Sequence, residues 1–283
     1  MRPMNRKLSV ALIVFLAIFA GQTAHARACL IGECSAMTTE FRNLELRPRT
    51  IALLPPISTL IEKGIMNDSD KTSETALLES VLTQKLEKEI SSRGYDVRVL
   101  TFDEINNDAQ LSSLVNEANT RFDEEYSKIQ TFKVSGVKYR RYSVGDKGRM
   151  LANYLGVDAV AFPRMEAQGA SGAAKLVKAI GSGGDTTYIA MEFGLVHART
   201  GDLEGFFGAI KYGSMFGTSL KKILDKPDKF MGDVAKTSIK KLPKAGQALD
   251  PEKLKETPNE LVLYDPVDED ALLDDLEGLL DEE

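Results

Sequence analysis

The fold class follows from the stretch RTIALLPP, residues 49–56, and from the two segments after it. A short apolar run that two prolines stop is typical of a buried strand ending in a loop. Residues 73–93 predict a helix because their apolar side chains share one face: Leu78, Val81, Leu82, Leu86 and Ile90. Residues 96–100 alternate like a second strand. Strand, helix and strand at this spacing indicate a βαβ or closely related unit, which belongs to the α/β class.

Alternating strands and helices continue toward the C-terminus. The predicted elements are helix 103–118, helix 145–155, strand 157–163, strand 188–197, strand 203–213 and helix 227–242. The clearest signal is the alternation over 188–197, which a turn at 198–202 connects to its return strand in a hairpin. Gly156 can close the helix before it, and Pro227 can occupy the first turn of the last helix. The pattern predicts five strands in all.

The N-terminus predicts export. Arg2, Arg6 and Lys7 precede an uncharged, mostly apolar run that ends in the small-x-small site Ala24-His25-Ala26. These are the three regions of a secretory signal peptide, so we assign residues 1–26 to it and expect cleavage after Ala26. A membrane anchor is the alternative interpretation, but the run is short for a spanning helix, which needs about 20 residues.

Both cysteines lie in the segment 27–48 that follows the predicted cleavage site. In an oxidising compartment, a close pair such as Cys29 and Cys34 most simply forms a small local disulfide. The alternative is lipidation of Cys29, although Ala26-Arg27-Ala28 is a poor match to a lipoprotein signal because it lacks Leu and contains Arg. Metal binding by two cysteines without a nearby histidine is not expected.

Two segments lack a clear period. Residues 119–143 are polar, and basic side chains there alternate with tyrosines, a combination that can bind nucleic acid. An exported protein rarely meets nucleic acid, so a loop or an exposed β-edge is the better interpretation. Residues 167–186 are rich in Gly, Ala and Ser and predict a mobile loop. The Gly-Ser-Gly-Gly run at 181–184 lacks the Lys-Ser/Thr ending of a phosphate-binding loop.

The charge of the chain is unevenly distributed. The formal net charge is −6, from 36 Lys and Arg against 42 Asp and Glu, yet residues 265–283 hold ten acids and no base. Three of the bases lie in the signal, so residues 27–264 have 33 basic and 32 acidic side chains. Within them, residues 219–244 are basic, with eight lysines against three aspartates. This basic segment could pair with the acidic tail of the same chain, but exposed ion pairs contribute little, so a solvated helix face beside a solvated tail is the favoured interpretation. A nearly neutral body therefore precedes an acidic tail.

The acidic tail also carries an amphipathic pattern. Five leucines fall on one helical face: Leu272, Leu273, Leu276, Leu279 and Leu280. Asp274, Asp275 and Glu277 lie around the other face. A short amphipathic helix on an acidic segment is typical of a peptide that docks into a hydrophobic groove. The alternatives are a solvated tail or a last helix that packs on its own domain, and residues 244–264 form the connector.

The order of the motifs resembles the α/β domain, similar to anticodon-binding domains, of several bacterial envelope proteins. The motifs are Leu54-Pro55-Pro56, Arg93-Gly94-Tyr95, the strand to Leu100, Leu155-Gly156-Val157-Asp158-Ala159-Val160, Arg199-Thr200-Gly201-Asp202 and Lys241-Leu242-Pro243. Families with this domain include curli-secretion lipoproteins, lipoprotein activators of penicillin-binding proteins, and the N-terminal domain of the Tol-system periplasmic protein. Over 49–243, the resemblance implies a mixed β-sheet of about five strands with helices on both faces. It also implies no enzymatic activity, and binding to other envelope proteins or assembly into rings.

Two functions follow as hypotheses. The first is a non-catalytic protein, periplasmic or outer-membrane-associated, that serves interaction, assembly or secretion in the cell envelope, with the tail as docking arm and a homo-oligomer as one possible state. The second is a periplasmic hydrolase or transferase that uses His197 or a carboxylate pair. The sequence has two histidines, two cysteines and no nucleophile-elbow or paired-histidine motif, which favours the first hypothesis. Neither a cofactor, a metal nor a nucleic-acid partner is expected, and membrane contact is expected only by association or through Cys29 lipidation.

Overall fold

The computed structural model describes residues 33–63, 69–70, 72–135, 142–170, 187–212 and 220–248. Its strands are β1 (Glu33–Met37), β2 (Thr50–Leu53), β3 (Ile57–Lys63), β4 (Ser69–Asp70), β5 (Asp96–Val99), β6 (Ala159–Ala170), β7 (Tyr188–His197) and β8 (Leu203–Tyr212). Its helices are α2 (Thr39–Arg42), α3 (Thr72–Ser91), α4 (Phe102–Asn107), α5 (Ala109–Ser135), α6 (Gly145–Leu155), α8 (Leu220–Asp225) and α9 (Pro227–Ile239). Within these ranges, no helix combines the length and the apolar character that a membrane crossing requires.

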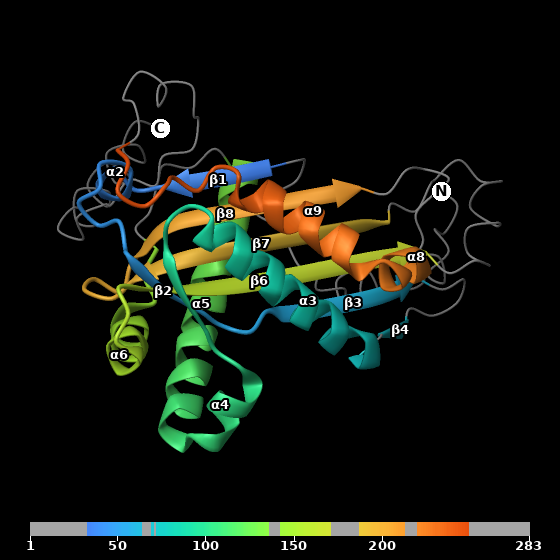
Figure 1. Cartoon of the computed structure of the whole chain (residues 1–283), viewed down its shortest axis with the longest axis horizontal. Coiled ribbons are helices and arrows are strands. Elements are labelled where there is room, and N and C mark those ends of the chain that lie inside the picture. The colour runs from blue at the N-terminus through green and yellow to red at the C-terminus, as the bar shows by residue number, and fades with distance from the viewer. Residues whose placement is uncertain are drawn as a thin grey trace, which may run out of the picture.

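The described strands form one mixed sheet with β6 in its interior (Figure 1). On one side, β7 pairs antiparallel with β6, and the sheet continues through β8 to the edge strand β1. On the other side, β6 pairs in parallel first with β2 and then, farther along, with β3. Because β5 pairs in parallel with β2 and α3 lies between them in the chain, the predicted strand–helix–strand unit is confirmed.

Pro55 and Pro56 determine where the sheet divides into two halves. Leu53 pairs with Ala161 and Ile57 with Arg164, so this stretch holds one residue more than the part of β6 that it faces. Neither proline has an N–H for the ladder, and the extra residue makes an irregularity of the bulge type. Before the prolines the outer neighbour is β5, and after them it is β4.

The α/β class and the mixed sheet are confirmed, but the described residues alone form a sheet of eight strands and not of about five. The three additional strands are β1, β3 and β4. The two prolines predict the end of a strand, whereas the backbone returns to the edge of β6 as β3 directly after them. Strand β1 lies in the segment 27–48, for which the sequence predicted only the roles of the two cysteines. The sheet therefore includes residues before the predicted domain start at 49.

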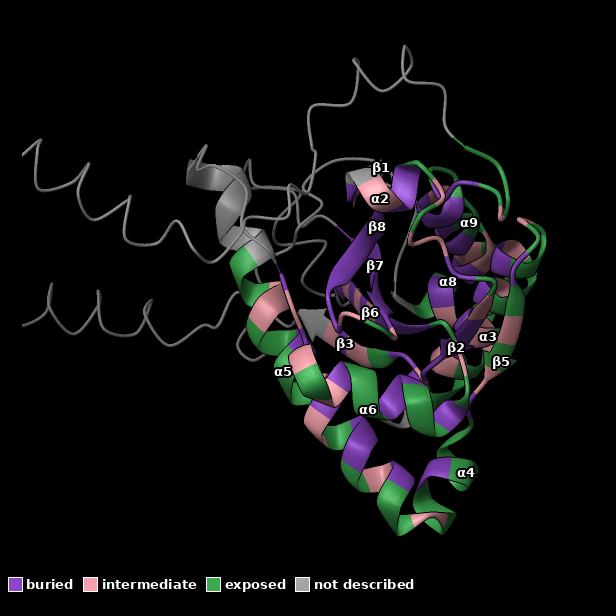
Figure 2. Cartoon of the chain, turned by 90° about the vertical axis from the view of Figure 1, so that its left-hand side faces the viewer, coloured by how far each residue is buried: buried purple, intermediate pink, exposed green. Residues whose placement is uncertain are grey.

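Helices cover both faces of the sheet, as the resemblance implies (Figure 2). The buried side chains of α3 and α9 form one core with the sheet, and those of α5 and α6 form the other. Strand β2 and the residue after it contribute to both cores, because Ile51 and Leu53 enter the first core and Ala52 and Leu54 the second. A strand buried on both faces is apolar without alternation, which explains the continuous run at 51–54.

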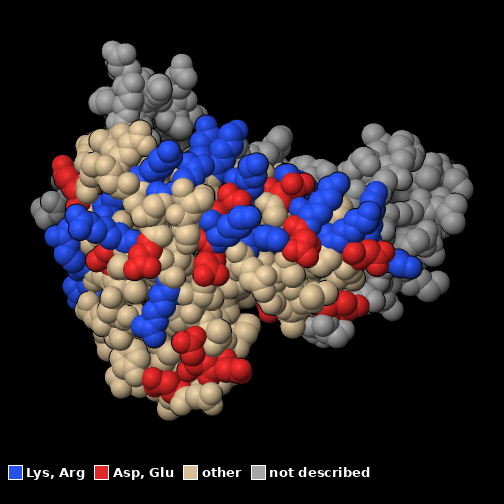
Figure 3. Space-filling model, viewed as in Figure 1, with Lys and Arg blue, Asp and Glu red and all other residues tan. Residues whose placement is uncertain are grey.

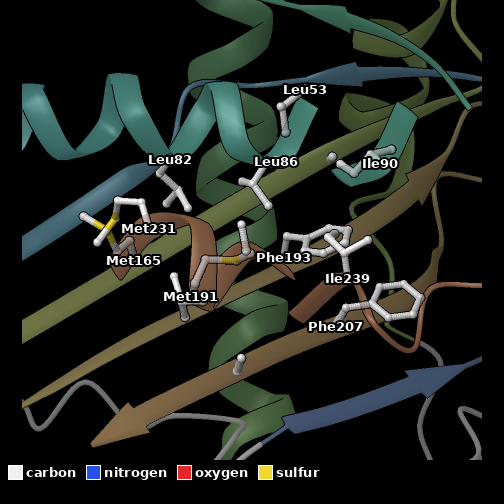
Figure 4. Close-up of a cluster of buried hydrophobic side chains, with 14 of the residues drawn as sticks. Leu53, Leu82, Leu86, Ile90, Met165, Met191, Phe193, Phe207, Met231 and Ile239 are labelled. Atoms are coloured by element: carbon white, nitrogen blue, oxygen red, sulfur yellow. The ribbon is translucent and has the colours of Figure 1, made fainter. Parts of the chain in front are cut away.

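Figure 4 shows the first core between the helix pair and the sheet. Leu82, Leu86 and Ile90 of α3 meet Met231 and Ile239 of α9 above Met165, Met191, Phe193 and Phe207 of the sheet. All are at most 3% exposed. Each side chain of this size contributes about 1.5–3 kcal/mol when it is removed from water, so this layer is a principal source of stability.

The predictions of irregular structure for 119–143 and 167–186 are wrong in part. Residues 119–135 continue α5 and do not form a loop or a β-edge, because one apolar face extends through Ala118, Phe122 and Tyr126 while the outer face is charged. Residues 167–170 belong to β6 and not to a loop. Ser143, near the end of the first segment, forms an isolated antiparallel bridge with Asp202, in agreement with the prediction. Residues 136–141 and 171–186 lie outside the described residues.

The predicted helix over 103–118 is divided into α4 and α5 at Asp108. The Asp108 backbone is extended there, and its Oδ1 accepts hydrogen bonds from Gln110 N and Leu111 N, both at 3.0 Å. This arrangement is an N-cap, which starts α5 and explains the break. The bounds of α6 and β7 agree with the predictions, and Gly156 closes α6 with a positive φ of 66°.

Gly201 connects the β7–β8 turn to the start of α6. Its carbonyl accepts hydrogen bonds from Val144 N at 2.9 Å and from Gly145 N at 3.2 Å, and its φ is 74°. A Cβ at this position would lie 2.2 Å from Gly145 O. The close approach of two backbone segments therefore requires glycine here.

We expect Gly201→Ala to destabilise the protein more than Gly156→Ala does. Gly156 also has a positive φ, but a Cβ there meets no atom within 4 Å. The control substitution should lower the free energy of unfolding by about 1–2 kcal/mol through backbone strain alone. Gly201→Ala should cost about 1–3 kcal/mol more because of the clash, as measured by urea unfolding. Equal losses in the two variants would show that the turn accommodates a Cβ at position 201 without a further loss of stability.

Candidate functional site

His197, the histidine of the second hypothesis, ends β7 beside the hairpin turn, as the sequence predicts. Its side chain is buried, and its Nδ1 accepts a hydrogen bond from Arg199 N at 3.1 Å. Burial and the charge of Arg199 lower the pKa of His197, and the carboxylates of Asp158 and Asp202 oppose this only in part. The imidazole is therefore neutral at pH 7, with Nδ1 as acceptor and its proton on Nε2.

Asp158, the acid next to His197, holds the start of β2. Its Oδ2 accepts hydrogen bonds from Arg49 N and Thr50 N, both at 2.9 Å, and Thr50 Oγ1 accepts one from Asp158 N at 2.9 Å. Burial alone would raise the pKa of Asp158, but these hydrogen bonds and the nearby His197 lower it overall. The Asp158 carboxylate thus binds backbone amides. Together, Asp158 and His197 join the start of β2, the start of β6 and the end of β7.

A second carboxyl lies at the start of β8, where the strand is irregular. Leu195 pairs with Gly205 but Val196 pairs with Leu203, so Glu204 is the extra residue. A bulge redirects a side chain, and here Glu204 Oε2 accepts a hydrogen bond from Thr38 Oγ1, in the link between β1 and α2. Thr38 N also donates to Glu204 O at 2.9 Å. Glu204 therefore attaches the N-terminal elements to the sheet.

Glu204 shares its buried position with a second acid. Asp202 and Glu204 are each 1% exposed. Burial raises the pKa of Glu204 to about 7, the charges of Asp202 and Glu40 add to the rise, and the hydrogen bonds from Thr38 and Thr200 oppose it. Sequence reasoning missed this cluster because Thr38 and Glu204 lie 166 positions apart. The one signal was a glutamate in the apolar strand 203–213.

We expect Glu204→Gln to change the pH dependence of stability. The folded protein holds the Glu204 proton up to a pH of about 7, whereas the unfolded chain releases it near 4.5. Wild type should therefore lose stability as the pH rises from about 4.5 to 7, and the always neutral glutamine should remove that loss. The advantage of the variant should be absent near pH 4 and on the order of 2–4 kcal/mol at pH 8.

Urea unfolding at a series of pH values measures the effect. Glu87→Gln, an exposed glutamate on α3, is the matched control and should leave the pH profile of wild type unchanged. Parallel profiles of wild type and Glu204→Gln would contradict a proton held at this site.

The C-terminal end of α9 is fixed by side chains from elsewhere in the chain. Arg93 donates hydrogen bonds to Lys240 O at 3.1 Å and to Leu242 O at 3.0 Å, Arg47 donates to Lys244 O at 3.0 Å, and Tyr95 Oη donates to Pro243 O at 2.8 Å. Burial raises the pKa of Tyr95 to about 12, against the nearby charges of Arg47 and Arg93. These donors bind the carbonyl of the helix C-cap, Lys240, and three carbonyls of the segment that follows α9. The chain beyond α9 therefore leaves the domain from a defined point.

The predicted basic segment lies on α8, on α9 and just beyond them, where Lys and Arg gather on the surface in Figure 3. We call this surface the basic face and define it by eight exposed lysines: Lys221, Lys222, Lys226, Lys229, Lys236, Lys240, Lys241 and Lys244. Two of its three aspartates are bound by lysines from other elements. Asp228 pairs with Lys85 at 2.7 Å, and Asp233 with Lys211 at 3.6 Å. The excess of positive charge on α8–α9 is thus a property of the folded surface.

Most predicted site residues lie outside the described ranges. These are Cys29 and the tail residues Leu272, Leu273, Asp274, Asp275, Leu276, Leu279 and Leu280. The backbone of Cys34 lies in β1, opposite Gly208 of β8. The disulfide and the docking helix therefore stay predictions. In the part of the chain that is described, no group of three or more His, Cys, Asp or Glu side chains is placed to hold a metal ion.

No model of a known protein family matches the chain, and no curated protein matches its sequence. Among solved structures, the PelC dodecamer from Paraburkholderia phytofirmans (space group P6) is 9% identical, with a TM-score of 0.35 over 76% of this chain and 98% of that one. The lipoprotein GNA1162 from Neisseria meningitidis is 17% identical, with a TM-score of 0.26 over 61% of this chain and 86% of that one. At TM-scores this low, neither likeness bears on the function of the chain.

Proposed function

We propose that this chain is an exported, non-catalytic interaction or assembly protein of the bacterial cell envelope, periplasmic or outer-membrane-associated. The signal pattern at 1–26 supports export. The observation that carries the proposal is the separation of charge between the basic face and a ten-acid, leucine-bearing tail. Charge concentrated in this way produces a local electrostatic potential that attracts an oppositely charged surface.

The positions of the titratable groups support a role without catalysis. The His197 Nδ1 and the Asp158 carboxylate accept hydrogen bonds from backbone amides at a corner of the sheet. A hydrolase or transferase built on a carboxylate pair is the alternative, and the raised pKa of Glu204 beside Asp202 is the observation that favours it. Both acids are 1% exposed, however, so a substrate would have no access to them in this structure.

The acidic tail is the proposed docking arm. Its leucine face, Leu272 to Leu280, fits a hydrophobic groove on another envelope protein or on a second copy of this chain. Gly278 and the dense negative charge weaken an isolated helix there, so the tail needs a surface on which to fold. Such a segment binds by folding onto its partner, with the folded domain as its carrier.

We expect the leucines, and not tail length, to determine partner capture from detergent extracts of the envelope. Deletion of 265–283 and the triple substitution Leu273→Ser, Leu276→Ser and Leu280→Ser should each abolish capture, because both remove the apolar face. Leu261→Ser, Val262→Ser and Leu263→Ser, an equal change in the connector, is the matched control.

Quantitative mass spectrometry of the captured proteins, with circular dichroism to check the fold of each variant, gives the result. A truncated protein that still retrieves the same partners would remove the docking role. Capture that is lost in the connector control as well would show that the leucine face is not specific.

The intact mass of the exported protein tests the N-terminal predictions. Cleavage after Ala26 with a disulfide between Cys29 and Cys34 gives a chain that starts at Arg27 and gains about 2 Da on reduction. Lipidation instead gives a chain that starts at Cys29 with added acyl mass, and a retained signal gives the full-length mass. Either of these results would contradict the predicted processing.

A further inference from the structure

The basic face has one line of charge that is well placed for a long anionic partner. On α9 and at its C-cap, Lys229, Lys236 and Lys240 are spaced by seven and four residues. The C-cap keeps a helical backbone, so the three lysines lie within about 20° of one line along the helix. Asp233 also lies near this line, but its carboxylate pairs with Lys211 of β8. With thirteen residues, α9 is about 20 Å long, and α8 extends the positive surface at its N-terminal end.

The opposite side of the molecule lacks such an excess. Four bases on α5 and α6 each pair with an acid on the same two helices: Arg121 with Glu124, Lys128 with Glu125, Lys147 with Glu117 and Arg149 with Asp146. That surface is charged but balanced. An anionic segment would therefore be attracted to the α8–α9 side and not to the α5–α6 side.

The acidic tail belongs to the same chain and can reach this face. The described structure ends at 248, just after the carbonyls of Lys240 to Lys244 that Arg93 and Arg47 bind. Residues 249–264 then span about 22 Å on average and about 55 Å at full extension, against about 20 Å for α9. A linker of this length holds a tethered segment at an effective concentration in the millimolar range.

We infer that the acidic tail, residues 265–283, docks through its carboxylates on the basic face of its own domain. This inference rests on the proposed function and extends it, because it assigns the surface on which the docking arm binds. Ten acids meet the eight lysines of α8–α9, and the attraction is of the kind that salt weakens. Each exposed pair contributes less than about 1 kcal/mol, so the tail is held by the sum and stays exchangeable.

The docked orientation follows from the lack of apolar surface on the basic face. Among the described residues, the large apolar side chains that are exposed lie on other elements: Ile57, Leu77, Phe102, Met150 and Tyr154. The leucines of the tail therefore have no exposed apolar surface to bind on α8–α9, and the acids face the lysines. Neutralising the acids removes the like-charge repulsion that opposes the tail helix, so docking orders the leucine face and presents it outward to a partner.

Zero-length cross-linking of the complete exported protein with a water-soluble carbodiimide tests this inference. The reagent joins a lysine amine to a carboxylate in direct contact, and peptide mass mapping locates each link. At about 0.05 M NaCl, links should join the tail to Lys221, Lys240, Lys241 or Lys244, and at about 0.5 M their yield should fall at least about fivefold. Mixed isotope-labelled and unlabelled protein separates links within one chain from links between two chains.

Two charge-reversal variants sharpen the experiment. Lys226→Glu, Lys229→Glu and Lys236→Glu should reduce tail links to the unchanged lysines of the basic face at least about fivefold. Arg121→Glu, Lys147→Glu and Arg149→Glu make the same charge change on α5 and α6 and should leave those links intact. The salt series on the unchanged protein stands by itself if the first variant does not fold.

The outcomes separate this inference from the proposed function. Tail links that are absent, insensitive to salt, or mapped to α5 and α6 would overturn self-docking, and links that form only between two chains would assign the basic face to a second copy. Loss of self-docking with partner capture still dependent on the leucines would leave the proposed function standing. Self-docking without leucine-dependent capture would instead contradict the role of the tail in partner binding and leave its docking on the basic face standing.

Discussion

The architecture depends on the pairing of β6 along both of its edges. β7 lies along one edge, and on the other edge β2 and β3 share the strand, with Pro55 and Pro56 between them. In a buried strand an unpaired backbone group costs about 1–3 kcal/mol, so these partners are not optional. The β2–β5 half and the β3–β4 half are joined by ladder contacts only through β6 in the described sheet. Both cores, and hence the helices above and below, are built on this strand.

The sequence predicted the elements whose signals are local. The alternation over Tyr188–His197, the positive-φ stop at Gly156 and the leucine stripe of α3 each report the environment of nearby residues, and the structure agrees with all three. It could not predict β1 or β3, because an edge strand and a strand after two prolines take their conformation from distant partners. The second half of α5 was missed because Phe122 and Tyr126 supply its inner face with only one large side chain per turn.

The residues of the candidate site show the same difference between local signals and contacts that join distant parts of the chain. The lysines of α8–α9 and the position of His197 at a strand end were visible in the sequence, since both depend on spacing within one element. The contact of Thr38 with Glu204 was not visible, because it joins two residues 166 positions apart and depends on a bulge. Sequence patterns thus identified the exposed chemistry of this chain and missed the buried carboxyl that anchors its N-terminal elements.

The position of β1 has a consequence for the order in which the chain becomes native. β1 is the first described strand, and its partner β8 follows more than 160 residues later. Synthesis proceeds from the N-terminus, so this strand is made long before the strand that completes it. Contacts of such high sequence separation form slowly, so the β1 edge of the sheet is expected to close late in folding. Until β8 is present, the backbone groups of β1 lack the partners that the native sheet gives them.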